Sequence, residues 1–391
     1  MKDFLLRGIV VLFLSSSTCF SIFGQGAIDP GELGGQVNII STAVPFLGIA
    51  PDSRAGGMGN AGVASTPDVN SQHWNPAKFA FIDGNMGVAM SYTPWLRKLV
   101  NDINMYYLTG FMRIDEMQVV SGSLRYFTLG DITFRTSQED IGYQVKPNEF
   151  ALDLAYSRLL SEYFSGAVAF RYIRSDLFQG FSEHGELSAG NSFAADLAFY
   201  FRSNTNLFGS NSEISSGINI SNIGSKISYD GFDKQFIPTN MRLGVGVSTE
   251  LDAYNAVSFS LDLNKLLVPT PGLSIAEDGE IFYPDTYRDM SVTKAMFRSF
   301  SDAPGGFKEE MQEISYALGA EYWYDQQFAI RAGYFHEHEN KGNRKHFTAG
   351  IGLKFNMLTL DASYIIPVVQ NNPLANTIRF TLGIDLDQMK K

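Results

Sequence analysis

The chain has 391 residues, of which 45% are hydrophobic and 13% aromatic, and its formal net charge at pH 7 is −11. This acidic balance argues against nucleic acid as a partner, because binding of phosphates requires a basic patch. The single cysteine, Cys19, lies in an apolar N-terminal stretch, so a disulfide framework and cysteine-based chemistry are excluded. Beyond that stretch no run of about 18 residues is apolar, which excludes helical transmembrane spans.

Residues 1–25 are expected to be a secretory signal peptide. Lys2 and Arg7 supply a positive start, and residues 8–23 are apolar except for serines and a threonine. An uncleaved anchor helix is the alternative, but this run is too short and too rich in serine to span a bilayer comfortably. Lipidation at Cys19 is a second alternative, but the residues before it lack the leucine and small apolar residues of such a site.

Residues 26–84 show no regular alternation and are rich in Gly, Pro, Asn and Asp. Their glycines Gly57, Gly59 and Gly62 match the G-x-G-x-x-G pattern of dinucleotide-binding folds. That interpretation requires a hydrophobic strand before the glycines and a helix after them, whereas prolines interrupt both flanks. We therefore interpret the segment as a tightly folded plug, in which glycines permit positive φ and close approach of the backbone.

From residue 85 onward, large apolar residues alternate with small or polar ones. In the segment 150–157, Leu152 and Leu154 share one face, whereas Ala151 and Asp153 share the other. Most such segments have the length that a tilted strand needs to cross a bilayer, and their number is even. They predict an all-β fold, a transmembrane antiparallel β-barrel of about fourteen strands within residues 85–391. The segments lie near 86–92, 103–112, 118–127, 149–158, 164–174, 192–202, 213–222, 240–249, 255–264, 314–324, 327–336, 346–356, 357–365 and 376–386.

The connections between these segments alternate in length. After even-numbered segments they are short, as at 250–254 and 325–326. This pattern is typical of outer-membrane barrels, with short periplasmic turns, long external loops and a periplasmic N-terminus. A secreted β-sandwich is the alternative, but it gives no reason for a strict alternation. After odd-numbered segments the connections are long, at 128–148, 175–191, 223–239 and 265–313.

The longest predicted external loop, 265–313, is rich in aromatic residues. Exposed aromatic side chains are liabilities unless they meet a partner, so we regard them as candidate partner-binding residues. The alternative is that they fold down onto the mouth of the barrel. The residues are Phe282, Tyr283, Phe297, Phe300 and Phe307.

The sequence predicts no catalytic residue, no cofactor-binding residue and no metal site. His336, His338 and His346 lie in or beside one predicted loop, but neighbouring histidines in a solvated loop are usually only solvated. No nucleophile elbow, zinc pattern or phosphate loop is present. The protein is therefore not expected to be an enzyme.

Two motifs resemble the N-terminal hatch of the FadL-like outer-membrane family. They are Asp52-Ser-Arg-Ala-Gly-Gly-Met-Gly-Asn-Ala-Gly-Val-Ala64 and Trp74-Asn75-Pro76-Ala77. In that family a Gly-rich stretch and an Asn-Pro-Ala motif precede a fourteen-stranded barrel, which implies that Asn75 and Pro76 belong to the plug. The stretch 38–59 more specifically resembles the PorV family of the type IX secretion system of Bacteroidetes.

The resemblance to the PorV family implies a role in protein secretion. It implies association with a SprA/Sov-type translocon, binding of the C-terminal signal domains of secreted cargo, and transfer of cargo to the attachment complex that contains the PorU sortase. It also implies contact with outer-membrane lipid and lipopolysaccharide.

A FadL-type transporter of fatty acids or other hydrophobic molecules is the rival hypothesis. Its plug would act as a gate, and Gly122 in the third segment could kink a lateral opening or simply face the lumen. An apolar inner pocket would favour the transporter hypothesis. The expected inner face of the barrel is polar, which favours the secretion hypothesis. The interior is expected to be wide, with residues 26–84 in its periplasmic half. The polar inner residues are Asp153, Arg242, Asp262, Thr348, Lys354, Asp361 and Arg379.

Overall fold

The computed structural model describes most of the chain from Asn38 onward. The expected signal peptide, the first residues of the expected plug, and Tyr283 lie outside the described residues. The described residues are 38–97, 100, 102–134, 143–178, 187–207, 209–271, 274–275, 281–282, 289–368 and 373–387.

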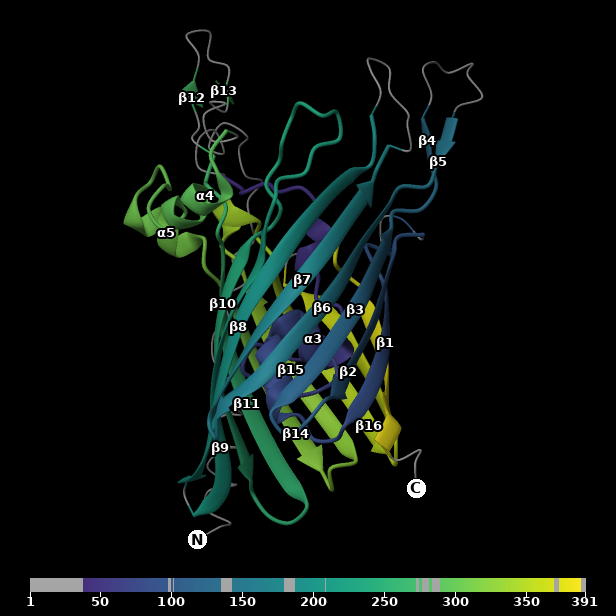
Figure 1. Ribbon diagram of the computed structural model, residues 1–391, viewed down its shortest axis with the longest axis vertical. Coiled ribbons are helices and arrows are strands. Elements are labelled where there is room, and N and C mark those ends of the chain that lie inside the picture. The colour runs from purple at the N-terminus through teal and green to yellow at the C-terminus, as the bar shows by residue number, and fades with distance from the viewer. Residues whose placement is uncertain are drawn as a thin grey trace. The chain divides into compact units, whose positions relative to one another are not determined.

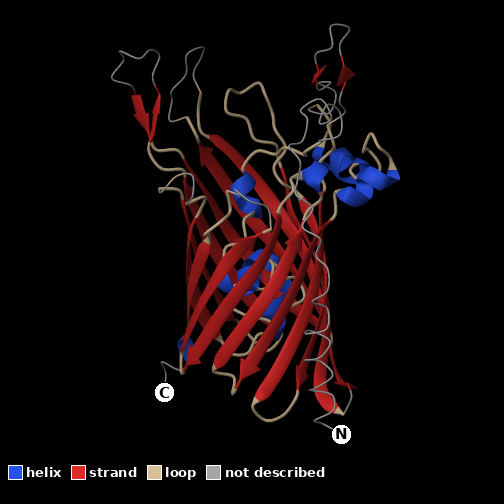
Figure 2. Ribbon diagram, turned by 180° about the vertical axis from the view of Figure 1, so that it is seen from behind, coloured by secondary structure: helices blue, strands red, loops and turns tan. Residues whose placement is uncertain are grey.

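Fourteen antiparallel strands form a closed barrel in which the first strand pairs with the last (Figures 1 and 2). Every predicted segment corresponds to one of them, so the predicted fold class is confirmed. The barrel strands are β1 (Met86–Pro94), β2 (Asn104–Arg113), β3 (Gln118–Thr128), β6 (Asn148–Ser161), β7 (Phe164–Asp176), β8 (Gly190–Leu207), β9 (Ser210–Gly224), β10 (Asn240–Glu250), β11 (Asn255–Leu266), β14 (Ser315–Tyr324), β15 (Phe328–His336), β16 (Lys345–Phe355), β17 (Leu358–Pro367) and β18 (Ile378–Asp385).

The remaining elements belong to the long loops and to the segment inside the barrel. None of the helices described is long and apolar enough to cross a membrane. The loops hold the strand pairs β4 (Ile132–Phe134) with β5 (Tyr143–Val145) and β12 (Ser274–Ile275) with β13 (Ile281–Phe282), and the helices α4 (Val292–Arg298), α5 (Phe307–Gln312) and η4 (Glu339–Lys341). The segment inside the barrel forms η1 (Pro45–Gly48), α2 (Ser53–Gly57), α3 (Ser71–Trp74) and η2 (Pro76–Phe81).

Alternation along each strand separates the two faces of the barrel wall. On β6, Leu154 is 66% exposed on the outer face, whereas Asp153 beside it is 2% exposed on the inner face. Successive side chains of a strand point to opposite sides, so large apolar residues gather outside and polar residues inside. The predicted faces of this segment are confirmed.

Residues that tolerate positive φ close the short turns. Asn356 has φ 49° between β16 and β17, and Asp325 has φ 52° between β14 and β15. Asn and Asp enter the left-handed region more readily than other residues with a side chain. A few residues therefore suffice to reverse the chain at this end of the barrel.

The segment from Asn38 to about residue 84, named the plug here, fills the barrel along its length (Figure 1). At the long-loop end, Asn38 N donates to Asn340 O at 3.1 Å. At the short-turn end, the Arg113 guanidinium donates to Ile82 O. The plug thus extends further than expected, because its first residues reach the long loops instead of staying in the half with the short turns.

Candidate functional site

The seat of the plug is a contact of backbone against backbone. Gly59, which has φ +67°, lies against Gly333 on β15, and Met58 before it lies against Gly319 on β14. A Cβ atom on Gly333 would lie 2.0 Å from Gly59 N, which no packed side chain tolerates. Thr348 Oγ1 on β16 accepts from Gly59 N and donates to Gly57 O, both at 2.8 Å. Gly57 and Gly59 therefore lie where the plug approaches the wall most closely.

A buried carboxylate on β11 holds the next part of the plug. Asp262 Oδ2 accepts hydrogen bonds from the N–H groups of Gly62 at 2.7 Å and Val63 at 2.9 Å. A Cβ atom on Gly62 would lie 2.4 Å from the Trp74 ring, so glycine is required here too. Trp74 Nε1 donates to Asp52 Oδ1 at 2.6 Å, and the other oxygen of Asp52 caps the start of α2.

The Asn-Pro-Ala motif fixes the end of the plug to the opposite side of the barrel. Asn75 is fully buried; its Oδ1 caps η2, and its Nδ2 donates to Phe199 O on β8 at 2.9 Å. Pro76 O accepts from Ser157 Oγ on β6 at 2.7 Å. A Cβ atom on Gly217 of β9 would lie 2.6 Å from Asn75 Nδ2. The motif thus works as an anchor between three strands.

A buried ion-pair network joins the plug to β14, β15 and β17. Glu321 accepts from Arg54 Nη2 and Arg331 Nε, each at 2.7 Å, and Arg331 Nη1 donates to Asp361 at 2.6 Å. Arg54 also pairs with Asp68 at 3.1 Å. The sequence placed Asp361 inside but missed the network, since only the closed barrel brings Arg54 to these strands. Arg54 lies within a glycine-rich run that was expected to pack tightly. A buried cation requires a carboxylate partner, so this arginine was the residue from which a buried ion pair could have been predicted.

The interior is packed, and the expectation that it is wide was wrong. Ala155, an inner residue of β6, is 7% exposed because the plug covers it. A cavity of about 460 Å³ remains at the short-turn end. Its lining combines apolar side chains with charged ones; they include Phe81, Phe111, Trp323, Arg54, Glu321, Arg331 and Asp361.

The loop between β11 and β14 carries aromatic side chains into solvent. Phe297 on α4 is 81% exposed and Phe307 on α5 is 80% exposed, while Phe300 between the helices is 48% exposed. Phe297 and Phe307 therefore do not fold onto the mouth of the barrel. The side chain of Phe282 and all of Tyr283 lie outside the described residues.

Ion pairs, named the carboxylate clamp here, hold α5 to the barrel. Lys265 Nζ at the end of β11 contacts Glu310 at 3.0 Å and Glu313 at 2.6 Å. Lys341 Nζ on η4 contacts Glu309 at 2.6 Å and Glu313 at 3.0 Å. Burial opposes the charge on Glu309, but the hydrogen bonds from Lys341, Gly305 N and Asn38, together with the charge of Lys341, outweigh burial and lower the pKa of Glu309 below its usual value.

The clamp also touches the first described residue of the plug and one further acid. Asn38 Nδ2 donates to Pro271 O at 3.1 Å and to Glu309 Oε1 at 3.3 Å. Asp302 Oδ2 accepts from Thr270 N at 3.2 Å. Burial, reinforced by the nearby glutamates, raises the pKa of Asp302 to about 6. The exposed aromatic loop and the start of the plug are therefore fastened together.

Comparison with known proteins decides the family. The family model described as "Type IX secretion system protein PorV" matches residues 34–273, which contain the plug glycines Gly57, Gly59 and Gly62 and the Asn-Pro-Ala motif. The chain belongs to the PorV family. It is thus a β-barrel component of type IX secretion in the outer membrane. No curated protein matches it significantly in sequence.

Solved structures with a similar fold are barrels of low sequence identity. The toluene transporter TodX of Pseudomonas putida has 10% identity and a TM-score of 0.47, over 89% of this chain and 98% of that chain. The toluene transporter TbuX of Ralstonia pickettii has 10% identity and a TM-score of 0.44, over 86% and 97%. A FadL homologue of Pseudomonas aeruginosa has 11% identity and a TM-score of 0.42, over 89% and 99%.

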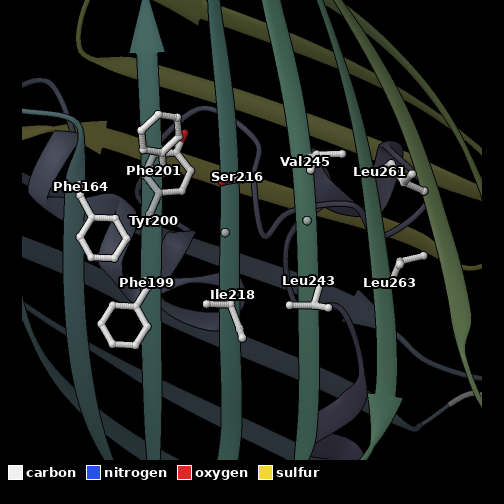
Figure 3. A pocket seen from close by; sticks show the side chains of 12 residues that line it. Phe164, Phe199, Tyr200, Phe201, Ser216, Ile218, Leu243, Val245, Leu261 and Leu263 are labelled. Carbon is white, nitrogen blue, oxygen red and sulfur yellow. The ribbon is translucent and has the colours of Figure 1, made fainter.

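An apolar depression of about 410 Å³ lies on the outer wall of this PorV-family barrel, across β7 to β11 (Figure 3). Its lining includes Leu243 and Val245, which are 39% and 54% exposed on the outer face, so it faces lipid and not the lumen. Gly122 on β3 lies among outward residues in an unbroken register. It therefore neither kinks the wall nor faces the lumen.

The candidate residues form two separate groups. The plug residues Gly57, Gly59, Gly62, Asn75 and Pro76 are packed inside the barrel, whereas the aromatic residues project from the loop outside it. Within the described ranges, no group of three or more His, Cys, Asp or Glu side chains is placed to hold a metal ion. The exposed group is the one that is free to contact another molecule.

Proposed function

We propose that this PorV-family barrel associates with a SprA/Sov-type translocon, binds the C-terminal signal domain of exported cargo, and passes the cargo to the attachment complex that contains PorU. The observation that carries the proposal is the family match over residues 34–273. In this scheme residues 1–25 are removed as a signal peptide, residues 26–84 form the plug, the N-terminus is periplasmic, and the long loops are extracellular. The alternation of short turns with long loops supports this orientation.

The partner-binding surface in this proposal is the aromatic loop, with Phe282, Tyr283, Phe297, Phe300 and Phe307. Its support is the exposure of Phe297 and Phe307, since aromatic anchors commonly dominate protein interfaces. The carboxylate clamp keeps α5 in a defined position before a partner arrives, which lowers the entropic cost of binding. In this role the plug is a support for the loops.

The test is replacement of Phe297, Phe300 and Phe307 together with serine. Each buried anchor typically contributes roughly 2 kcal/mol or more to an interface, so the triple variant should release the translocon or the cargo signal domain. The barrel should still fold and remain heat-modifiable on gels, because these side chains contribute little to the folded state. Phe232→Ser is the matched control, as Phe232 is 90% exposed on a different long loop.

The rival transporter of hydrophobic molecules predicts the opposite outcome. Protein complexes would persist in the triple variant, while altering the plug at Asn75 and Pro76 would abolish uptake of a hydrophobic substrate. Deletion of the gene with normal export of surface proteins, and with a growth defect only on a lipid or hydrocarbon source, would overturn the secretion role.

A further inference from the structure

The hairpin of β8 and β9 continues past its neighbour on one side. Pairing between β7 and β8 ends at Phe164 with Phe201, whereas pairing between β8 and β9 continues to Leu207 with Ser210. Residues 203–207 thus have β9 on one edge and no barrel strand on the other. Figure 1 shows this hairpin at the lower, short-turn end of the barrel.

The register identifies the main-chain groups at the open edge. Arg202 N donates to Tyr163 O at 2.9 Å, across the gap to the turn between β6 and β7. Alternate residues of an antiparallel strand direct both N–H and C=O to the same edge, so Asn204 and Asn206 direct theirs to the open edge. Among the described residues, the hydrogen bond found at the open edge is a long one, in which Ser203 Oγ donates to Asn204 O at 3.5 Å.

This edge is short, but it lacks the other features that normally prevent strand addition. Exposed edges are usually protected by charged side chains, prolines or bulges. Residues 203–212 contain neither a charged residue nor a proline. The register of β8 and β9 is regular from Leu197 to Leu207, since its one shift lies further back, between Ala195 and Leu197. Asn204 and Asn206 therefore present main-chain N–H and C=O groups that another strand could reach.

We propose that residues 203–207 bind an extended, uncharged segment of a soluble protein, which adds to β8 as an antiparallel strand. Main-chain hydrogen bonds supply the affinity in this mode of recognition, and alternate side chains supply the selectivity. The side chains of Ser203, Asn204, Thr205 and Asn206 are polar and uncharged. The nearest charges on the hairpin, Arg202 and Glu213, pair with each other at 3.4 Å, so a charged segment would have to compete with that ion pair for a counter-ion. Tyr163, 52% exposed beside the open edge, favours an apolar residue at one end of the segment.

Symmetry excludes pairing of residues 203–207 with the same residues of a second copy of this chain. Two copies in one bilayer are related by an axis along the membrane normal. A two-fold axis that relates paired antiparallel strands is perpendicular to those strands. Barrel strands are tilted by roughly 35–45° from the normal, so one axis cannot satisfy both conditions. The occupant is a different molecule, on the aqueous side where the short turns lie.

Proline substitution at the two edge residues tests the proposal. Asn204→Pro with Asn206→Pro removes the N–H groups of the open edge but leaves the hydrogen bonds to β9, which use alternate residues. Asn204→Ala with Asn206→Ala is the control, since it changes the same side chains and keeps the N–H groups. The probe is a nine-residue peptide of alternating threonine and valine with capped ends and a neutral fluorescent label, added to the purified full-length barrel in detergent. Binding is followed by fluorescence anisotropy.

The wild-type and alanine proteins should bind the peptide equally, and the proline protein should bind at least ~10-fold more weakly, because two hydrogen bonds are lost. Hydrogen exchange on the wild-type protein gives a second measurement: the amides of Asn204 and Asn206 should slow when the peptide is added. Equal binding to the proline protein, no binding to the wild-type protein, or unchanged exchange would overturn the proposal. Each result is independent of whether the barrel acts in cargo transfer.

Discussion

The glycine seat of the plug and the aromatic loop above the barrel are built on opposite principles. At the seat, Gly59 and Gly333 meet with no side chain between them, and a buried ion-pair network begins two residues along the strand, at Arg331. On the loop, Phe297 and Phe307 extend into solvent, and α5 is held by a clamp at the rim. Close packing is therefore concentrated inside the wall, while the surface available to a partner lies outside it.

The largest expected effect comes from removing the charge at the centre of the buried network. Glu321→Gln leaves Arg54 and Arg331 without their shared carboxylate and should destabilise the barrel by about 3–5 kcal/mol. Urea titration of refolding into bilayers measures this loss. Glu213→Gln is the control, because its pair with Arg202 is partly exposed and should cost less than about 1 kcal/mol. Equal losses in the two variants would remove the contrast between the inside and the rim.

A smaller effect should follow from adding one methyl group at the seat. Gly333→Ala forces the plug away from β15 and should cost about 1–3 kcal/mol by overpacking. Limited proteolysis should then cut the plug faster, while the exposed loop is cut at the same rate as before. Gly48→Ala, where a Cβ atom meets nothing within 4 Å, should leave both rates unchanged. Faster cutting in the loop alone would show that the seat is not the rigid region.

The smallest effect concerns pH and the loop. Because the pKa of Asp302 is raised from 3.8 to about 6, the folded loop binds this proton more tightly than the unfolded chain does. Ionisation therefore destabilises the loop: its stability should fall as pH rises from about 4 to about 6 and then stay level. Since Asp302 is half exposed, solvent screening keeps the effect below roughly 1 kcal/mol. Hydrogen-exchange protection of the loop should show this slope in the wild-type protein and lose it in Asp302→Asn.

Most of the fold could be predicted from local sequence patterns alone. Alternation placed Leu154 outside and Asp153 inside, because the period of two is a property of each strand by itself. The end of β8 was missed: the prediction stopped at residue 202, since the polar run 203–206 has no apolar face that would indicate a strand.

Contacts across the barrel could not be predicted in the same way. Gly59 was recognised as a close-approach glycine, but its partner Gly333 follows only from closure of the sheet. The filled interior was missed for the same reason, since polar inner residues are equally compatible with a water-filled lumen and with a polar plug. The sequence did not predict whether Phe297 and Phe307 are exposed, because an aromatic residue in a loop can either face solvent or pack against the barrel.

The plug has a consequence for how the barrel closes. The seam joins β1 to β18 across most of the chain, and the entropic cost of closing a loop grows with its length. Ser53 N, on α2, donates to Thr381 Oγ1 on β18 at 2.9 Å, although the two residues are 328 positions apart. Once α2 rests on β18, only about thirty residues separate it from the start of β1. The plug is then a short tether that keeps the first strand beside the last.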